Sequence, residues 1–555
     1  MQKKRGKYTI FVFLQTTMTI EELQKRFCPK ETAKMQAFLQ EPKSQQIVQL
    51  NGLVGSSYPL FVSNLAENMT GVHLFALNSR ERAAYFYNDL EKLLNDRNVP
   101  LPNKRVHYLP SSFKRAHNTD EIDNSNVKLR SEIVNKIASH PDGDYIIVTY
   151  PEALAEKVVT PKFLSDNSFV IRQGNEIPTD IFLQFLYEFE YLQEDFVFEP
   201  GQFAWRGNIF DIFSFSEEYP YRIELDGDTI ESIRFFNPET QLSIREEPEI
   251  RIMPKIVSLD KEEQRISLLD FLPPETVLWL DNPKDIGSQI GQLYKTVKEE
   301  FEDDNLEHKN SVDELFIGKR DFDSACTGHL QFHINSKNDS AGQTIDFALK
   351  PQNNFGRSFD YLFLEWIDNM ELGIRSVFMA ENQSQLDRLY KIMLDLLDKY
   401  NKHNATNYKI EPLYYPIRYI LHEGFRDENH KLAVYTDHQF LEKHERVVIR
   451  DRYKKSEAFT LREIYDLQPG DYVVHIDYGI GIYQGLEKTE MNGKEQEVIK
   501  LTYKDGDILY VSVHSLHKIS KYVGKDGTAP TLHRIGSGTW DKIKERTKKR
   551  IKELA

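Results

Sequence analysis

Apolar and polar positions follow different periods along the chain, and each change of period predicts a change of domain. Between about residues 45 and 160, short apolar runs at 46–50, 72–77 and 145–149 alternate with stretches of helical period. Alternating strands and helices predict a parallel sheet covered by helices. The polar stretch 118–126 is predicted to be a loop within this region.

The pattern then shifts to short alternating runs between about 165 and 250. A helical run at 181–191 leads into strands that are punctuated by Gly207 and Gly227. This texture predicts a small α+β domain of antiparallel strands. Strand and helix patterns resume at 276–280 and 286–301, so the α+β domain is predicted to be inserted into the α/β domain.

Two further patterns of apolar and polar residues follow towards the C-terminus. A second α/β unit is predicted from about 346 to 450, with strands at 376–379, 410–412 and 432–436 and a helix at 385–400. From 467 to about 522, short strands are separated by Asn492–Gly493 and Asp505–Gly506, which are favoured hairpin turns. Several short strands in so few residues predict a small β-barrel. The chain then ends in a basic helix whose apolar positions form one stripe.

The predicted fold class is therefore a multi-domain α/β and α+β protein. It comprises a degenerate P-loop-like parallel α/β domain with an inserted α+β domain, a second small α/β domain, and an SH3/Tudor-like β-barrel followed by a connector helix. The predicted boundaries are an extension at 1–17, the first α/β part at 18–165, the insert at 166–250, the second α/β part at 251–345, the small α/β domain at 346–452, the barrel at 453–530 and the connector helix at 531–555.

Composition narrows the functional classes. The 555 residues include 71 lysines and arginines against 86 acidic residues, a net charge of −15, which argues against a protein that coats nucleic acid. The only cysteines, Cys28 and Cys326, provide neither a disulfide framework nor a four-cysteine zinc site. No apolar run approaches the roughly 20 residues of a membrane span, so the cytoplasm is the expected location. Residues 1–17 are predicted to be an unstructured extension or an upstream start ahead of Met18.

The glycine turn after the first predicted strand is a candidate phosphate loop. Gly52, Gly55, Ser56 and Ser57 lie between a strand and a helix, where backbone N–H groups can bind an anion. A working nucleotide loop also needs a lysine for the phosphates and a hydroxyl for magnesium, but Tyr58 and Pro59 follow Ser57. The turn therefore predicts a degenerate, non-hydrolysing relic.

Two arginines stand out among the apolar strands of the insert. Arg206 and Arg222 flank strands in which alternation assigns most aromatic side chains to a core. Arginine suits partner surfaces because its planar fork pairs with carboxylates. Solvated strand arginines are the simpler explanation, and spacing alone leaves both open.

The barrel region also holds a histidine beside an acid. His475 and Asp477 occupy alternate positions of a short strand with no third ligand nearby, so a structural histidine is expected rather than a metal or catalytic pair. The sequence contains no HExxH, GxSxG, CxxC or GxxxxGK(S/T) motif and no DEAD-like helicase box. The last fifteen residues hold seven lysines and arginines and three acidic residues, a net charge of +4, consistent with a solvated connector helix or with DNA contact.

These motifs together resemble the transcription-repair coupling factor (Mfd) family. GDYVVHIDYGIGIY at 470–483 and KLTYKDGDILYVSVHSLHKISKYVG at 500–524 are similar to the RNA-polymerase-interacting module that the family shares with CarD-type regulators. GQFAWRGNIFDIF and PYRIELDGDTIESIRFF, which begin at Gly201 and Pro220, resemble the part of the family that is similar to UvrB. GLVGSS at 52–57 is similar to the family's degenerate nucleotide loop.

The resemblance implies a function. Family members bind stalled RNA polymerase, push it with an ATP-driven double-stranded DNA translocase and recruit UvrA for nucleotide excision repair. It implies UvrA contacts at Arg206, Arg222 and, where the family has an aromatic residue, Asp226. It also implies contacts with the polymerase β subunit in two segments that are expected to be neighbouring strands, one comprising Lys488, Thr489 and Glu490, the other Ile508, Leu509, Tyr510 and Val511.

The chain is accordingly predicted to be a monomeric, non-membrane adaptor that corresponds to the N-terminal part of such a factor. ATP, magnesium and DNA binding are expected only in a translocase that follows the connector helix, and no cofactor or metal is expected in this part. One alternative is a UvrB-like helicase subunit with its own ATPase, against which the missing lysine argues. Another is a plain CarD-type regulator, against which the UvrB-like block argues.

Overall fold

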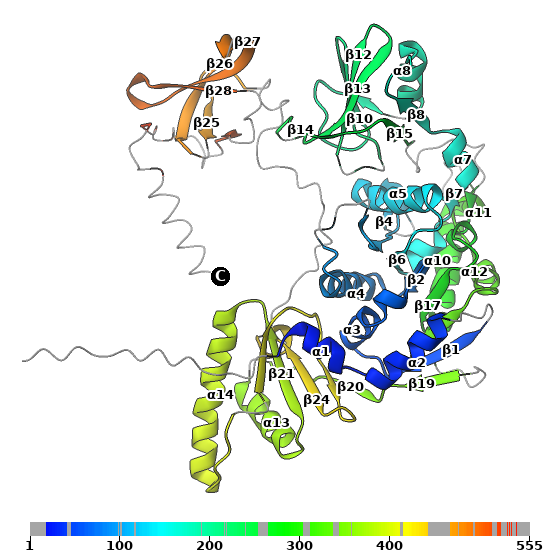
Figure 1. Cartoon of the computed structure of the whole chain (residues 1–555), viewed down its shortest axis with the longest axis vertical. Coiled ribbons are helices and arrows are strands. Elements are labelled where there is room, and N and C mark those ends of the chain that lie inside the picture. Colours follow the sequence, from blue (N-terminus) through cyan, green and yellow to red (C-terminus); the bar gives the residue numbers. More distant parts are fainter. Residues whose placement is uncertain are drawn as a thin grey trace, which may run out of the picture. The chain divides into compact units, whose positions relative to one another are not determined.

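The computed structural model has a mixed α/β and α+β architecture with one large parallel sheet and several antiparallel ones (Figure 1). It describes residues 18–40, 46–253, 265–303, 311–336, 343–441, 467–512 and 519–522 with short interruptions, and a few isolated positions up to 540. The predicted extension at 1–17 and most of the predicted connector helix at 531–555 lie outside the described residues. Two compact units form, one from 1–165 with 259–449 and one from 166–258 with 450–555. The predicted mixed architecture is confirmed, while the exact domain boundaries stay predictions.

A seven-stranded, all-parallel sheet organises the first α/β domain, in the order β19-β1-β18-β17-β2-β6-β3. Strands from before and after the insert therefore share one sheet, in which β1 lies between β19 and β18. The strands are β1 Ile47–Asn51, β2 Val72–Ala76, β3 Val106–Tyr108, β6 Tyr145–Thr149, β17 Val277–Asp281, β18 Gln331–Ile334 and β19 Gln343–Asp346. The sheet's interior is aromatic: Trp279 stacks on Phe75 with ring centroids 4.9 Å apart.

Helices and short ribbons complete this domain. The helices are α1 Ile20–Arg26, α2 Pro29–Gln40, α3 Ser57–Ser63, η1 Ala66–Asn68, α4 Arg80–Leu93, α5 Asn124–Ser139, α6 Pro151–Ala155, α7 Pro161–Asp166, α9 Leu268–Phe271, α10 Pro283–Asp303, α11 Val312–Leu315 and α12 Lys319–Cys326. Two ribbons pair β4 Phe113–Arg115 with β5 Asn118–Ile122, and β7 Val158–Val159 with β16 Arg265–Ile266. The loop predicted at 118–126 is wrong, because β5 and the start of α5 occupy it.

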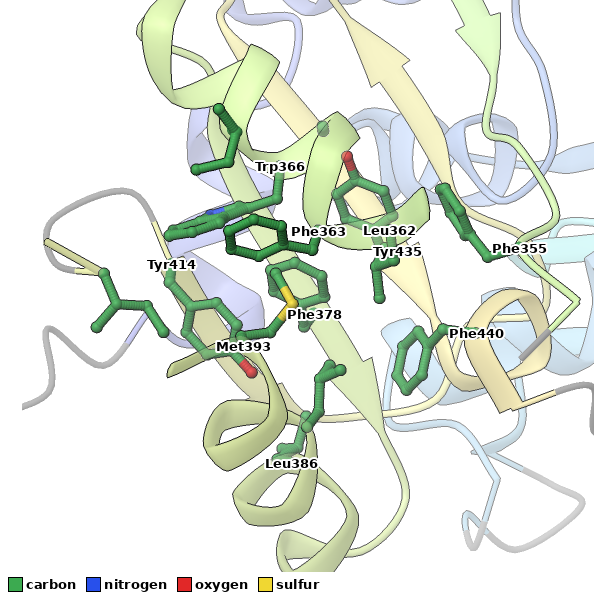
Figure 2. Close-up of a cluster of buried hydrophobic side chains, with 14 of the residues drawn as sticks. Phe355, Leu362, Phe363, Trp366, Phe378, Leu386, Met393, Tyr414, Tyr435 and Phe440 are labelled. Carbon is green, nitrogen blue, oxygen red and sulfur yellow. The ribbon is translucent and has the colours of Figure 1, made fainter. Parts of the chain in front are cut away.

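A mixed five-stranded sheet forms the second α/β domain, in the order β20-β23-β24-β21-β22. Its elements are β20 Leu349–Pro351, α13 Phe359–Glu371, β21 Arg375–Ala380, α14 Gln383–Asn404, β22 Tyr414–Arg418, β23 Phe425–Asp427, β24 Leu432–Thr436 and α15 Asp437–Leu441. The aromatic core lies between this sheet and its helices (Figure 2). The Phe378 ring stacks between Tyr414 and Tyr435, with centroid distances of 4.6 and 4.9 Å. The predicted strand at 410–412 falls mostly outside the described residues, and the strand that is found begins at Tyr414.

The inserted α+β domain has a six-stranded sheet in the order β14-β13-β12-β11-β10-β9, antiparallel except for the β9–β10 pair. Its elements are β8 Phe169–Arg172, α8 Thr179–Glu188, β9 Leu192–Gln193, β10 Gln202–Arg206, β11 Ile209–Ile212, β12 Tyr221–Asp226, β13 Thr229–Phe236, β14 Ser243–Glu246 and β15 Glu249–Ile252. One sheet face packs against α8, where the Phe182 and Phe210 rings meet at 5.7 Å.

The C-terminal sheet has five antiparallel strands in the order β28-β27-β26-β25-β29. Its elements are β25 Tyr472–His475, β26 Gly479–Met491, β27 Lys494–Thr502, η3 Lys504–Gly506, β28 Ile508–Ser512 and β29 Ile519–Lys521. β26 and β27 pair as far as Met491 and Lys494, and the predicted Asn492–Gly493 turn lies outside the described residues. Closure of these strands into a barrel stays a prediction.

A buried histidine in the parallel sheet makes this domain sensitive to acid. Trp279 Nε1 donates a hydrogen bond to His73 Nδ1 at 3.1 Å, so Nδ1 must be unprotonated. Burial accordingly lowers the pKa of His73 from its ordinary 6.5 to about 4. The unfolded chain then binds more protons than the folded one between pH 6.5 and 4, and stability falls as the pH falls through this window.

We expect His73→Gln to remove part of this pH dependence. Because His73 stays neutral in the folded protein, it should lower the free energy of unfolding by about 2 kcal/mol at pH 5 relative to pH 7. The conversion is about 1.36 kcal/mol per pKa unit. Urea unfolding followed by tryptophan fluorescence at both pH values measures the difference. An exposed-histidine variant, His403→Gln, serves as the control and should keep the wild-type difference. An unchanged difference in His73→Gln would contradict the assignment.

Candidate functional site

The strand register brings the two predicted UvrA-binding arginines together. Asp211 of β11 lies opposite Arg222 of β12, and Arg206 ends β10 two residue pairs away, opposite Ile209. Alternation along these strands sends the Phe203 and Phe210 side chains to the α8 side. The charged residues share the other side of the sheet. We call Arg206, Asp211 and Arg222 the arginine face.

Both arginines bind one buried carboxylate. Arg222 donates from Nε to Asp211 Oδ1 at 2.7 Å and from Nη2 to Oδ2 at 2.8 Å, and Arg206 Nη2 also donates to Oδ2. The Asp211 side chain is only 1% exposed. Arg222 Nη2 further donates to Gln241 Oε1 at 2.8 Å, and Arg206 Nη1 donates to the Asp195 carbonyl at 3.1 Å. This network fixes the orientation of both guanidinium groups.

Each guanidinium group also makes a cation–π contact with an aromatic ring. Arg206 lies over Phe196 and Arg222 over Phe236, each 4.3 Å from the ring centroid. Burial lowers the pKa of Arg206, while Asp211 opposes the shift, and an arginine stays charged in either case. The Arg206 side chain is 36% exposed, the Arg222 side chain 15%. Among the described residues Arg206 uses two of its five N–H donors, so it can still bind a partner.

The third predicted contact residue lies apart from this network. Asp226 is exposed at the end of β12, where Gly227 turns the chain into β13 with a positive φ of 62°. Alternation would place it on the same side as Arg222, but the β12–β13 register shifts between Glu224 and Leu225. Asp211, which holds the arginines, was not singled out by sequence reasoning. The sequence did hold a sign of its role, a charged residue inside an apolar strand. Such a residue is rarely buried unless it is paired.

The predicted polymerase-binding segment at 488–490 lies on an open sheet edge. Lys488, Thr489 and Glu490 belong to β26 and pair with residues 495–497 of β27. On the other side of β26, β25 pairs only with residues 479–482. The outer edge at 488–490 therefore has no partner strand within the described part of the chain. An unpaired edge of this kind can accept a strand from another protein.

The second predicted polymerase segment, 508–511, forms the edge strand β28, but it does not lie beside 488–490 as expected. Ile508 and Tyr510 of β28 are 48% and 49% exposed, whereas Val511 is 4% exposed and Leu509 packs on the sheet's apolar core. The expectation that 508–511 neighbours 488–490 is wrong, because β27 lies between β26 and β28. One added strand can therefore pair with only one of the two predicted segments.

His475 has a structural environment. It is buried, and its Nδ1 accepts a hydrogen bond from the Asp477 backbone N–H at 3.1 Å. Asp477 thus contributes its backbone N–H to the ring. This contact agrees with the structural histidine expected from the sequence.

Backbone donors of the glycine loop are already used within the protein. Gly52 N–H donates to Asn335 Oδ1 at 2.9 Å, and Ser56 N–H donates to the Glu423 carbonyl at 3.1 Å. Val54 N–H donates to Ser57 Oγ, which in turn donates to the Val54 carbonyl. A phosphate loop presents such donors to its ligand. Here acceptor atoms of the protein itself occupy these donors in place of a ligand.

Carboxylates lie against the same loop. A Cβ on Gly55 would meet Glu423 Oε2 at 3.0 Å, and Ser56 Oγ donates to buried Asp89 at 2.5 Å. Burial raises the pKa of Asp89 to about 6 and also raises that of Glu423. The segment that carries Glu423 comes from the second α/β domain. Gly52, Gly55, Ser56 and Ser57 thus join two domains, and negative charge where phosphates would bind argues against nucleotide binding.

Comparison with known proteins identifies two domains. The family model of the UvrB interaction domain matches residues 169–256, and that of the CarD-like/TRCF RID domain matches residues 467–523. The first match contains the arginine face and the second contains both edge strands. Among the described helices, none has the length and apolar character of a membrane span.

Several curated relatives share one name, transcription-repair-coupling factor. The protein from Bacillus subtilis (strain 168) is 27% identical over 579 residues, which covers 91% of this chain and 48% of the relative. Those from Staphylococcus aureus strains MRSA252 and Mu50 are 22% and 24% identical and cover 79% of the chain and 43% of each relative. The chain thus spans about half the length of the curated relatives it matches. The two matched domains and these relatives confirm that the chain is similar to the N-terminal portion of the transcription-repair coupling factors.

Proposed function

We propose that this chain docks UvrA and RNA polymerase as part of a transcription-repair coupling factor, and so recruits nucleotide excision repair to stalled transcription. The observation that carries the proposal is the presence of a UvrB interaction domain and a CarD-like/TRCF RID domain in one chain. UvrA is assigned to the first domain and the polymerase β subunit to the second. The chain acts as a monomer in this proposal.

The arginine face supports the UvrA assignment. Its guanidinium groups are held by buried Asp211 before any partner arrives, so little side-chain entropy is lost on binding. Arginine in such a position recognises carboxylates bidentately. We infer an acidic patch on UvrA as the complement, with Asp226 at the margin of the contact.

The parallel α/β domain serves as a scaffold in this proposal. Its glycine loop is occupied by protein groups, which disfavours the alternative of a UvrB-like ATPase. We assign the ATP-driven translocase, with its ATP, magnesium and double-stranded DNA, to the part of the relatives that the alignments leave out. That assignment rests on the resemblance.

Co-capture tests the proposal directly. Immobilised chain should retain purified UvrA and RNA polymerase core enzyme at the same time, because the two matched domains are separate in sequence. Surface plasmon resonance with sequential injection of the two partners measures this. Failure to retain either partner would remove that half of the function. DNA-stimulated ATP hydrolysis by the pure chain would favour the UvrB-like ATPase instead.

A further inference from the structure

Three side chains of metal-binding chemistry meet in the first compact unit. Cys28, at the junction of α1 and α2, lies beside Asp427 and His430 of the turn that joins β23 to β24, 399 residues away from Asp427. One ligand atom from each residue lies within 4.8 Å of the other two. Cys28 and Asp427 are fully buried, and His430 is partly exposed. No part of the proposed docking function uses this cluster.

Local packing holds the three residues in place. Phe27 and Phe425, which precede Cys28 and Asp427 in their segments, pack with ring centroids 5.1 Å apart and are both fully buried. Cys28 adopts a left-handed conformation with φ 43°, which turns the chain between the two helices. His430 N–H donates to Asp427 Oδ1 at 3.0 Å and fixes the turn. These contacts hold the three side chains together, as outer contacts orient the ligands of metal sites.

Distances between the ligand atoms suit a small tetrahedral ion. Cys28 Sγ lies 3.8 Å from Asp427 Oδ2, and His430 Nδ1 lies 2.8 Å from the same oxygen. Zinc bonds of 2.3 Å to sulfur and 2.0–2.2 Å to nitrogen or oxygen imply ligand separations of about 3.3–3.6 Å in a tetrahedron. The Sγ–Oδ2 separation is close to this range, and the Nδ1–Oδ2 separation would widen by about half an ångström to admit the ion. The mixture of thiolate, imidazole and carboxylate also favours zinc over magnesium or calcium.

A fourth group near the cluster lacks a partner. Glu31 follows Cys28 by one turn in α2, and its Oε2 atom is buried without a hydrogen-bond partner among the described residues. Glu31 also interacts electrostatically with Cys28. A buried carboxylate oxygen left unpaired is costly, and a cation would satisfy it.

We propose that Cys28, Asp427 and His430 bind one zinc ion, with Glu31 or a water as the fourth ligand. Without the ion, the Cys28 thiol and His430 Nδ1–H both donate to Asp427. Binding releases the thiol proton to solvent, and the imidazole proton moves from Nδ1 to Nε2. The bound ion ties the α1–α2 segment to the second α/β domain.

Metal content of the full chain tests the site. Tag-free protein is stripped with EDTA, incubated with a small excess of zinc chloride, desalted and analysed by plasma mass spectrometry. We expect about one zinc per wild-type chain and less than about a tenth in Cys28→Ser and His430→Gln. The second cysteine provides the matched control, since Cys326→Ser removes the other buried thiol and should keep the full zinc content. Circular dichroism confirms that each variant folds.

Cobalt gives an independent readout of the ligands. Cobalt(II) in the stripped protein should show a near-ultraviolet thiolate charge-transfer band that persists in Cys326→Ser and disappears in Cys28→Ser. His430 is partly exposed, so His430→Gln tests the site even if Cys28→Ser unfolds. The proposal is overturned if folded wild-type protein retains no zinc. It is equally overturned if both cysteine variants, or His430→Gln and wild type, retain the same amount.

Discussion

An Arg206→Glu variant should bind UvrA at least about thirtyfold more weakly than the wild-type chain. Truncating or reversing one partner of a desolvated interfacial charge pair costs about 2–5 kcal/mol, and each 1.4 kcal/mol is a factor of about ten in affinity. Arg206 is the more exposed arginine and keeps donors available for a partner. Isothermal titration calorimetry with purified UvrA measures the change.

Substitution of Arg222 is a less direct test of binding because Arg222 also stabilises the fold. It makes two hydrogen bonds to Asp211, a carboxylate that is 1% exposed. Removing one partner of a buried ion pair typically destabilises a protein by about 3–5 kcal/mol. In Arg206→Glu, Asp211 keeps Arg222, so the domain should stay folded. We therefore expect Arg222→Ala to lower both stability and UvrA affinity, and Arg206→Glu mainly affinity.

A matched control separates this effect from a general loss of positive charge. Arg172 lies in the same domain, pairs with Glu249 at the surface and is 59% exposed. Exposed ion pairs contribute little to stability, so Arg172→Glu should fold and bind UvrA within about twofold of wild type. Equal affinities of wild type and Arg206→Glu would show that the arginine face is not the UvrA site.

The parallel sheet was the most predictable part of the fold. The predicted strand at 145–149 coincides with β6, and that at 72–77 covers β2, because both are buried apolar runs between helices. The stretch 118–126 failed for a physical reason. Its first polar residues form one strand of a two-stranded ribbon. Asp123 follows as the helix cap, and its side chain accepts hydrogen bonds from the Ser125 and Asn126 N–H groups at the start of α5. Turn-forming residues and helix caps have the same composition.

Sites were predictable only where their contacts are local in sequence. Arg206, Asp211 and Arg222 meet because two consecutive hairpins bring them into register, and of these three residues sequence reasoning singled out the two arginines. The closure of the glycine loop was not predictable, since Glu423 N–H bonds Ser56 Oγ across 367 residues. The same holds for Cys28 and Asp427. No pattern within either segment indicates which distant residue it will contact.

A double variant of β28, Ile508→Ala with Tyr510→Ala, should bind RNA polymerase at least about tenfold more weakly. Both side chains are about half exposed on an edge strand, while Leu509 and Val511 supply the core, so the fold should persist. Interface aromatic anchors typically contribute 2 kcal/mol or more. Fluorescence anisotropy with labelled chain and core polymerase measures the affinity. Tyr361→Ala on α13, which removes a tyrosine that is 70% exposed in another domain, is the control and should bind normally.

The affinities of both variants for both partners test whether each domain docks its own partner. UvrA affinity should be unchanged in the β28 variant, and polymerase affinity unchanged in Arg206→Glu, if each domain docks its own partner. The two candidate edges, 488–490 and 508–511, flank β27 from opposite sides, so a single added strand can use only one of them. Full polymerase affinity in the β28 variant would contradict a role for Ile508 and Tyr510. It would leave the β26 edge at 488–490 as the docking strand, where main-chain hydrogen bonds tolerate Thr489.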